Sequence, residues 1–79
     1  MTPHQVLVKK VKAEARLIAA GQAIKQAEEW EKTARLAQTL DGRFYGRLLG
    51  KNLREVARDL TVNATRRLRN CARVEGGAN

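Results

Sequence analysis

Residues 3–40 form a long segment that has no proline after its first position and is rich in Ala, Glu, Lys, Gln and Leu. All of these residue types have high helix propensity. The segment also begins like a helix, because Thr2 can cap it, Pro3 suits the first helical position and Gln5 completes a capping box. No part of the chain shows the alternation of apolar and polar residues that a strand requires. We therefore expect an all-α protein.

Two apolar stripes run along this first helix, and one gives way to the other near Gly21. The first stripe consists of Leu7, Val11, Ala15 and Ile18. The second consists of Ala13, Leu17, Ala20, Ile24 and Ala27, followed by Ala23, Trp30, Ala34 and Ala37. Glycine inside a helix costs about 1 kcal/mol relative to alanine, so a break at Gly21 is one alternative. The other is an unbroken helix of roughly 57 Å, at 1.5 Å per residue, that is shared in a dimer.

A joint between helices is expected at residues 41–52, which read DGRFYGRLLGKN. Gly42 is a natural stop for the preceding helix, because glycine is the preferred residue just beyond a helix C-terminus. Gly50 would end the short turns that follow, and Asn52 and Glu55 then have the spacing of a second capping box. The sequence therefore predicts that a new helix starts after residue 52.

This last helix is expected over residues 53–73, followed by a frayed tail at residues 74–79. Its apolar side chains recur at helical spacing along one face. They are Leu53, Val56, Ala57, Leu60, Ala64, Leu68 and Cys71. A helix-turn-helix in the same region is an alternative, but Arg67 and Asn70 would fall where its second helix needs apolar residues.

The chain has 79 residues and only three aromatic ones, so we expect one domain, residues 1–79, with a thin core. A thin core favours a dimer or a docked partner over an isolated monomer. The predicted fold is therefore a helical hairpin or small bundle of two or three helices that dimerises. The single cysteine, Cys71, excludes an intramolecular disulfide and is expected to be a small buried thiol. Together with the lack of a membrane-length apolar run, this indicates a cytoplasmic protein.

The formal net charge is +8, and three quarters of this excess lies in the second half of the chain. Residues 1–41 carry seven Lys or Arg against five Asp or Glu, whereas residues 42–79 carry nine against three. Acids and bases of the first half stand four residues apart, as Glu31 and Arg35 do, so that they neutralise one another. The second half instead places like charges at that spacing, and its last helix has an arginine side opposite its leucines, formed by Arg54, Arg58, Arg66, Arg69 and Arg73. The cations expected to contact an anionic partner are Arg43, Arg47, Lys51, Arg54, Arg58, Arg66, Arg69 and Arg73.

Catalytic and cofactor signatures are missing from the sequence. LLGKN resembles the end of a phosphate-binding loop, but Asn52 replaces the required Ser or Thr and no strand precedes it. The lone His4 falls in a first helical turn, where we expect it to face solvent, and no metal-ligand spacing occurs. RFYGR has the cation and aromatic pattern of single-strand binders, although Phe44 is explained more simply as a plug of the helix joint. We expect no enzyme, metal or cofactor.

The leading hypothesis is a non-catalytic accessory or regulatory protein whose eight cations of the second half bind the phosphates of DNA or RNA. The arginine fork suits phosphate oxygens, and a polyanion gains affinity by releasing counterions. The same surface would also suit an acidic protein. The alternative hypothesis is a small modulator or inhibitor that docks on a larger protein through apolar residues left exposed on the first helix. These residues are Leu7, Val11, Ile18 and Trp30.

Overall fold

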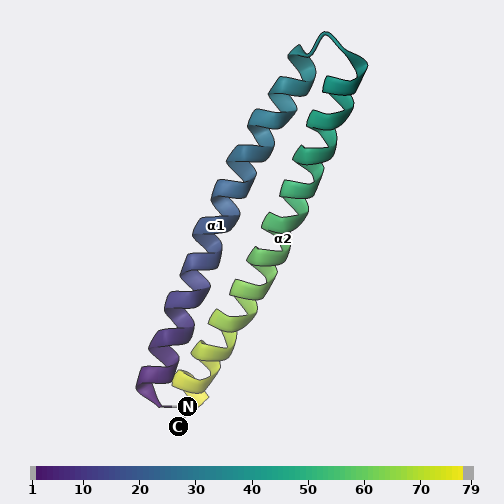
Figure 1. The fold of residues 1–79 in the computed structure, drawn as a ribbon. Coiled ribbons are helices and arrows are strands. Elements are labelled where there is room, and N and C mark those ends of the chain that lie inside the picture. Colours follow the sequence, from purple (N-terminus) through teal and green to yellow (C-terminus); the bar gives the residue numbers. More distant parts are fainter. Residues whose placement is uncertain (1, 78–79) are drawn as a thin grey trace.

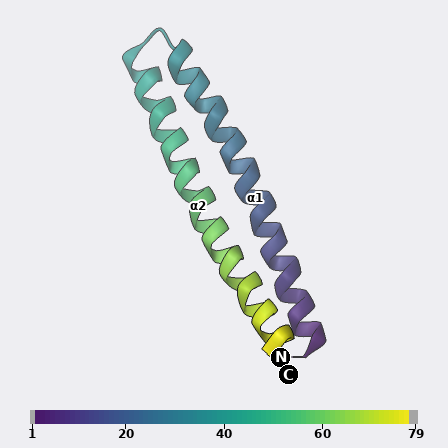
Figure 2. The same cartoon turned by 180° about the vertical axis from the view of Figure 1, so that it is seen from behind.

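The computed structural model describes residues 2–77, and the side chains of residues 2–75. The chain forms two antiparallel helices, α1 (Pro3–Leu36) and α2 (Leu40–Gly77), which pack along their whole lengths as a hairpin (Figures 1 and 2). The molecule is a rod of 61 × 15 × 12 Å, with both ends of the chain at the same end of the rod (Figure 1). The all-α hairpin expected from the sequence is confirmed, with two helices.

α1 begins where the sequence predicts. The backbone N–H of Thr2 donates to Gln5 Oε1 at 3.0 Å, and the N–H of Gln5 donates to Thr2 Oγ1 at 3.2 Å, which completes the capping box. The alternative of a break at Gly21 is wrong, because α1 continues through this residue. Gly21 is exposed, and the packing of α2 along α1 outweighs the helix propensity that one glycine loses. α1 then ends at Leu36 rather than at residue 40.

The joint between the helices is shorter and earlier than the sequence predicts, since it comprises only residues 37–39. Thr39 caps α2, because its Oγ1 accepts a hydrogen bond from the N–H of Gly42 at 3.1 Å. The Arg43 Nε donates to the carbonyl oxygen of Ala37 at 3.0 Å, which ties the start of α2 back to the end of α1. The expected joint at residues 41–52 is therefore wrong: this segment forms the first turns of α2.

Two glycines of this segment lie inside α2, at points where the helix closely approaches α1. A Cβ atom added at Gly46 would lie 2.8 Å from Ala34 Cβ and 2.8 Å from the carbonyl oxygen of Trp30. At Gly50 it would lie 2.9 Å from Glu31 Cγ. Glycine thus lets the two helices approach closely here, and neither glycine ends a helix.

α2 is continuous from residue 40 to residue 77, which corrects three further expectations. Asn52 lies inside the helix and caps nothing. No turn interrupts the chain near Thr61, so a helix-turn-helix is excluded. The tail predicted to fray from residue 74 is helical to Gly77, while residues 78–79 lie outside the described part of the chain.

The buried residues along the helix contact recur at a spacing of seven, and nearly all of them are small. The rows are Val6, Ala13, Ala20, Ala27 and Ala34 in α1, and Gly50, Ala57, Ala64 and Cys71 in α2, while Ala23 and Gly46 are buried beside them. A strict seven-residue repeat makes paired helices coil around each other with a left-handed twist. We call this row of small residues the alanine seam.

The core is as thin as the composition predicts. Cys71 is the largest fully buried side chain, and its burial is confirmed. Leu49, Leu53, Leu60 and Leu68 are half-buried beside the alanine seam. The expectation that Phe44 plugs the joint is wrong, because its side chain is 69% exposed on the outer side of α2.

Candidate nucleic-acid interface

All eight cations predicted to contact nucleic acid lie on α2, and all are exposed. Arg47, Lys51, Arg54 and Arg58 border one shallow depression, which Glu31 and Glu55 also line. The structure therefore brings half of the predicted set together, with α1 contributing an acid at the rim. We call this group of four cations the loop-side cluster.

Within the loop-side cluster, Arg54 forms a two-pronged ion pair with Glu31 of α1. Its Nε donates to Glu31 Oε2 at 2.8 Å, and its Nη2 donates to Oε1 at 2.7 Å. These hydrogen bonds raise the pKa of Arg54 and lower the pKa of Glu31. Arg54 is thus neutralised across the hairpin, and Glu31 pairs with it instead of with the expected Arg35.

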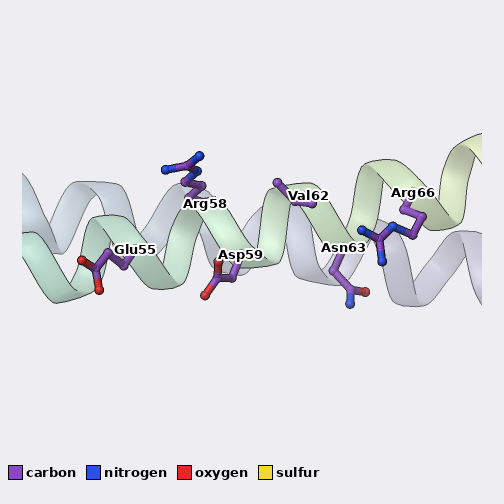
Figure 3. Close-up of a pocket in the computed structure, with 6 residues that line it drawn as sticks. All are labelled: Glu55, Arg58, Asp59, Val62, Asn63 and Arg66. Atoms are coloured by element: carbon purple, nitrogen blue, oxygen red, sulfur yellow. The ribbon is translucent and has the colours of Figure 1, made fainter.

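Farther along α2, Arg58 and Arg66 stand on the same helix as two acids, Glu55 and Asp59. Figure 3 shows the guanidinium of Arg58 pointing away from both carboxylates. Within residues 2–77 the structure records two ion pairs, Arg54 with Glu31 and Lys10 with Glu75. Arg58 and Arg66 therefore share a depression with Glu55 and Asp59 but form no ion pair with either acid.

The predicted cations do not all share one face. Arg54 reaches Glu31 on one side of the contact between the helices, whereas Arg66 borders a groove with Lys9 and Arg67. Arg43 uses its Nε to hold the helix joint. The predicted arginine face is therefore a band that crosses the outer side of α2, and Arg69 and Arg73 lie exposed toward its end.

Sequence reasoning missed a group of polar residues near the chain ends. Arg67 falls on the apolar side of α2 in the predicted register, and Lys9 and Lys12 belong to the helix whose charges are nearly balanced. The structure brings all three to adjoining depressions on one side of the hairpin. The register of α1 against α2, which only the fold supplies, is needed to see this.

The residues predicted as a protein interface are exposed. The exposed fractions of Leu7, Val11 and Ile18 are 59%, 57% and 65%, and that of Trp30 is 38%. The rings of Trp30 and Tyr45 meet edge to face with their centres 6.4 Å apart, so part of the Trp30 surface is covered by α2. Exposure of this kind leaves the apolar side chains of α1 available to a partner.

His4 is exposed, as expected. Residues 2–77 contain no group of three or more His, Cys, Asp or Glu side chains arranged to hold a metal ion. In this part of the chain neither helix has a stretch that is long and apolar enough to cross a membrane. Comparison of the chain with models of protein families, with curated proteins and with solved structures finds no match.

Proposed function

We propose that the protein binds nucleic acid without catalysing a reaction, and that exposed cations of α2 contact the phosphates. One observation carries this proposal: of sixteen Lys and Arg side chains, two are paired with a carboxylate in the described structure. A surface of unpaired guanidinium groups attracts phosphate, because phosphate oxygens fit the arginine fork and binding releases counterions.

The shape of the molecule supports the same proposal. A rod of 61 Å spans about 18 base pairs at 3.4 Å each. Because α2 is continuous and its cations are distributed from residue 43 to residue 73, several phosphates along one stretch of backbone are within reach at once. No base-reading element is required for this, so we expect binding with little dependence on sequence.

The test is fluorescence anisotropy with a short labelled duplex, measured at several salt concentrations. Removal of one phosphate-binding cation should reduce the slope of log affinity against log salt by about 0.9. We therefore expect the triple substitution Arg47→Gln, Lys51→Gln and Arg58→Gln to weaken binding and to flatten the slope. The control is Lys25→Gln with Lys32→Gln, which lowers the charge of α1 instead. The proposal would be refuted if the affinity of the unchanged protein for the duplex did not depend on the salt concentration.

The exposed apolar side chains of α1 favour a second candidate function, the binding of a protein. Leu7, Val11 and Ile18 lie on one side of α1, away from the alanine seam, and each is more than half exposed. A second copy of the chain or a larger protein would bury this surface. Light scattering after size exclusion should show a mass above that of the 8.8 kDa monomer, and substitution of the three residues by serine should restore the monomer mass. A monomer at all concentrations would exclude self-association.

A further inference from the structure

A groove crosses from α1 to α2 in the half of the rod that holds the chain ends. Lys9, Asn63, Arg66, Arg67 and Asn70 line one part of it. The adjoining part is lined by His4, Gln5, Val8, Lys9, Lys12 and Arg67. Lys9 and Arg67 belong to both parts, so the two depressions form one continuous surface. We call it the terminal groove.

Beside the alanine seam, cations in and next to the terminal groove take positions that apolar residues and glycine occupy in the rest of the hairpin. Arg67 continues the row that Gly46, Leu53 and Leu60 form at a spacing of seven along α2, and its side chain is half-buried. Lys9 and Arg16 continue the corresponding row of Ala23 and Trp30 along α1. Placing three cations beside the seam gives up apolar burial and adds mutual repulsion. Stability of the hairpin alone therefore does not account for them.

The acids at this end of the rod lie on the other side of the hairpin. Glu75 forms an ion pair with Lys10, and the hydrogen bond between their side chains raises the pKa of Lys10. Glu14 stands four residues after Lys10 on α1, so it lies on that side as well. None of these carboxylates lines the terminal groove. Within residues 2–77 no cation of the groove forms an ion pair, and an acid, Asp59, borders a neighbouring depression with Asn63 and Arg66.

Neutral partners hold the arginines of this region in place. The Nε of Arg67 donates to Asn63 Oδ1 at 3.0 Å, and the Nη1 of Arg16 donates to the carbonyl oxygen of Lys12 at 3.2 Å. Arg54, by contrast, is held by the carboxylate of Glu31. An amide or carbonyl partner fixes a guanidinium without cancelling its charge, and Arg67 keeps its remaining N–H donors for another acceptor.

We propose that the terminal groove is a phosphate-binding site for the nucleic-acid backbone, with Lys9, Lys12 and Arg67 as direct contacts and Asn63 as a positioning residue. This inference rests on the proposed function and adds a contact surface formed by both helices. The backbone then runs from the loop-side cluster across α2 to the terminal groove, so that the two sites bind phosphates at opposite ends of the rod.

The test compares Lys9→Gln with Lys12→Gln, made together, against the control pair Lys25→Gln with Lys32→Gln. Both pairs remove two charges from exposed positions of α1, so only the location of the removed charges differs. Binding of a labelled duplex DNA is measured by anisotropy. At 0.1 M salt each phosphate-binding cation contributes about 0.9 log units, so removing two of them weakens binding by about 60-fold and reduces the salt slope by about 1.8. The control pair should change affinity by less than about threefold.

Asn63→Ala separates a positioning role from direct binding. It leaves the number of cations unchanged, so the salt slope should stay the same while affinity falls severalfold. Arg67→Gln should lower both the affinity and the salt slope. Circular dichroism of each variant confirms that the hairpin is folded.

The outcomes separate the two proposals. If the groove variants bind as the unchanged protein does while Arg47→Gln with Arg58→Gln weakens binding, phosphate binding in the terminal groove is refuted and the proposed function stands. If the groove pair and the control pair weaken binding equally, the effect is one of net charge and the groove is again refuted. If the unchanged protein does not bind duplex or single-stranded DNA or RNA, both proposals fail.

Discussion

Replacement of Gly46 by alanine tests how closely the two helices approach. The new Cβ would lie 2.8 Å from Ala34 Cβ and from the carbonyl oxygen of Trp30. Carbon contacts are optimal at about 3.5–4.0 Å, so this atom is too close by about 0.7 Å or more. Both obstacles are fixed to the backbone of α1 and cannot swing away. Overpacking of this kind costs about 1–3 kcal/mol.

Helix propensity acts in the opposite direction, since alanine in a helix interior is favoured over glycine by about 1 kcal/mol. Gly21→Ala provides the matched control, because a Cβ there meets nothing within 4 Å and Gly21 also lies inside a helix. The propensity gain is shared by the two variants. Their difference in unfolding free energy therefore isolates the packing cost, and we expect it to be about 1–3 kcal/mol.

The assay is thermal unfolding followed by circular dichroism, with all variants at one protein concentration. Each kcal/mol shifts the Tm of a domain this small by about 4–8 °C. We expect Gly21→Ala to melt above the unchanged protein and Gly46→Ala to melt below Gly21→Ala. Gly50→Ala should fall between them, because the nearest obstacle is Glu31 Cγ, a side-chain atom that can move. Equal melting temperatures for Gly21→Ala and Gly46→Ala would show that the helices do not approach closely at Gly46.

Three further predictions concern the ion pair, the helix start and the thiol. The pKa of Glu31 is lowered by Arg54, so the pair stabilises the hairpin above the carboxyl's ordinary pKa of 4.5, and this stabilisation disappears as pH falls through the lowered value. The Tm of the unchanged protein should therefore fall more on acidification than that of Glu31→Gln, and parallel curves would contradict this. Thr2→Ala removes a cap and should cost about 0.5–2 kcal/mol in unfolding free energy, measured by urea titration, whereas Thr2→Ser should cost little. Cys71 is buried, so a thiol reagent should label it slowly in the folded protein and rapidly in urea, and fast labelling without urea would contradict its burial.

The helical content and the start of α1 could be predicted from the sequence because both depend on local chemistry. Thr2 and Gln5 cap the helix within one turn, and helix-forming residues propagate it. The errors arise at Gly21, Gly42 and Gly50, where a local rule treats glycine as a helix end. Gly50 is helical because α1 packs against it, and a contact between residues so far apart in sequence is invisible to a local rule.

The candidate site was predictable in part. The α2 cations could be found because like charges recur at helical spacing within one segment. Two features needed the fold: the pairing of Arg54 with Glu31, and the meeting of Lys9 with Arg67. Each contact joins one residue of α1 to one residue of α2. Which residues meet depends on the register of the two helices, and the position and length of the joint set that register. A joint placed at residues 41–52 gives a different register and hides both.

The alanine seam has a consequence for how uniquely the hairpin is aligned. Ala13, Ala20, Ala27 and Ala34 are chemically interchangeable, so displacing one helix by a full repeat would bring methyl group against methyl group again. The seam alone thus tolerates several alignments of similar energy. The three-residue turn at residues 37–39 breaks this degeneracy, because a displaced helix would have to unwind to span it. Lengthening that turn with flexible residues should release a sliding motion, or an exchange of helices between two molecules, that the native connection forbids.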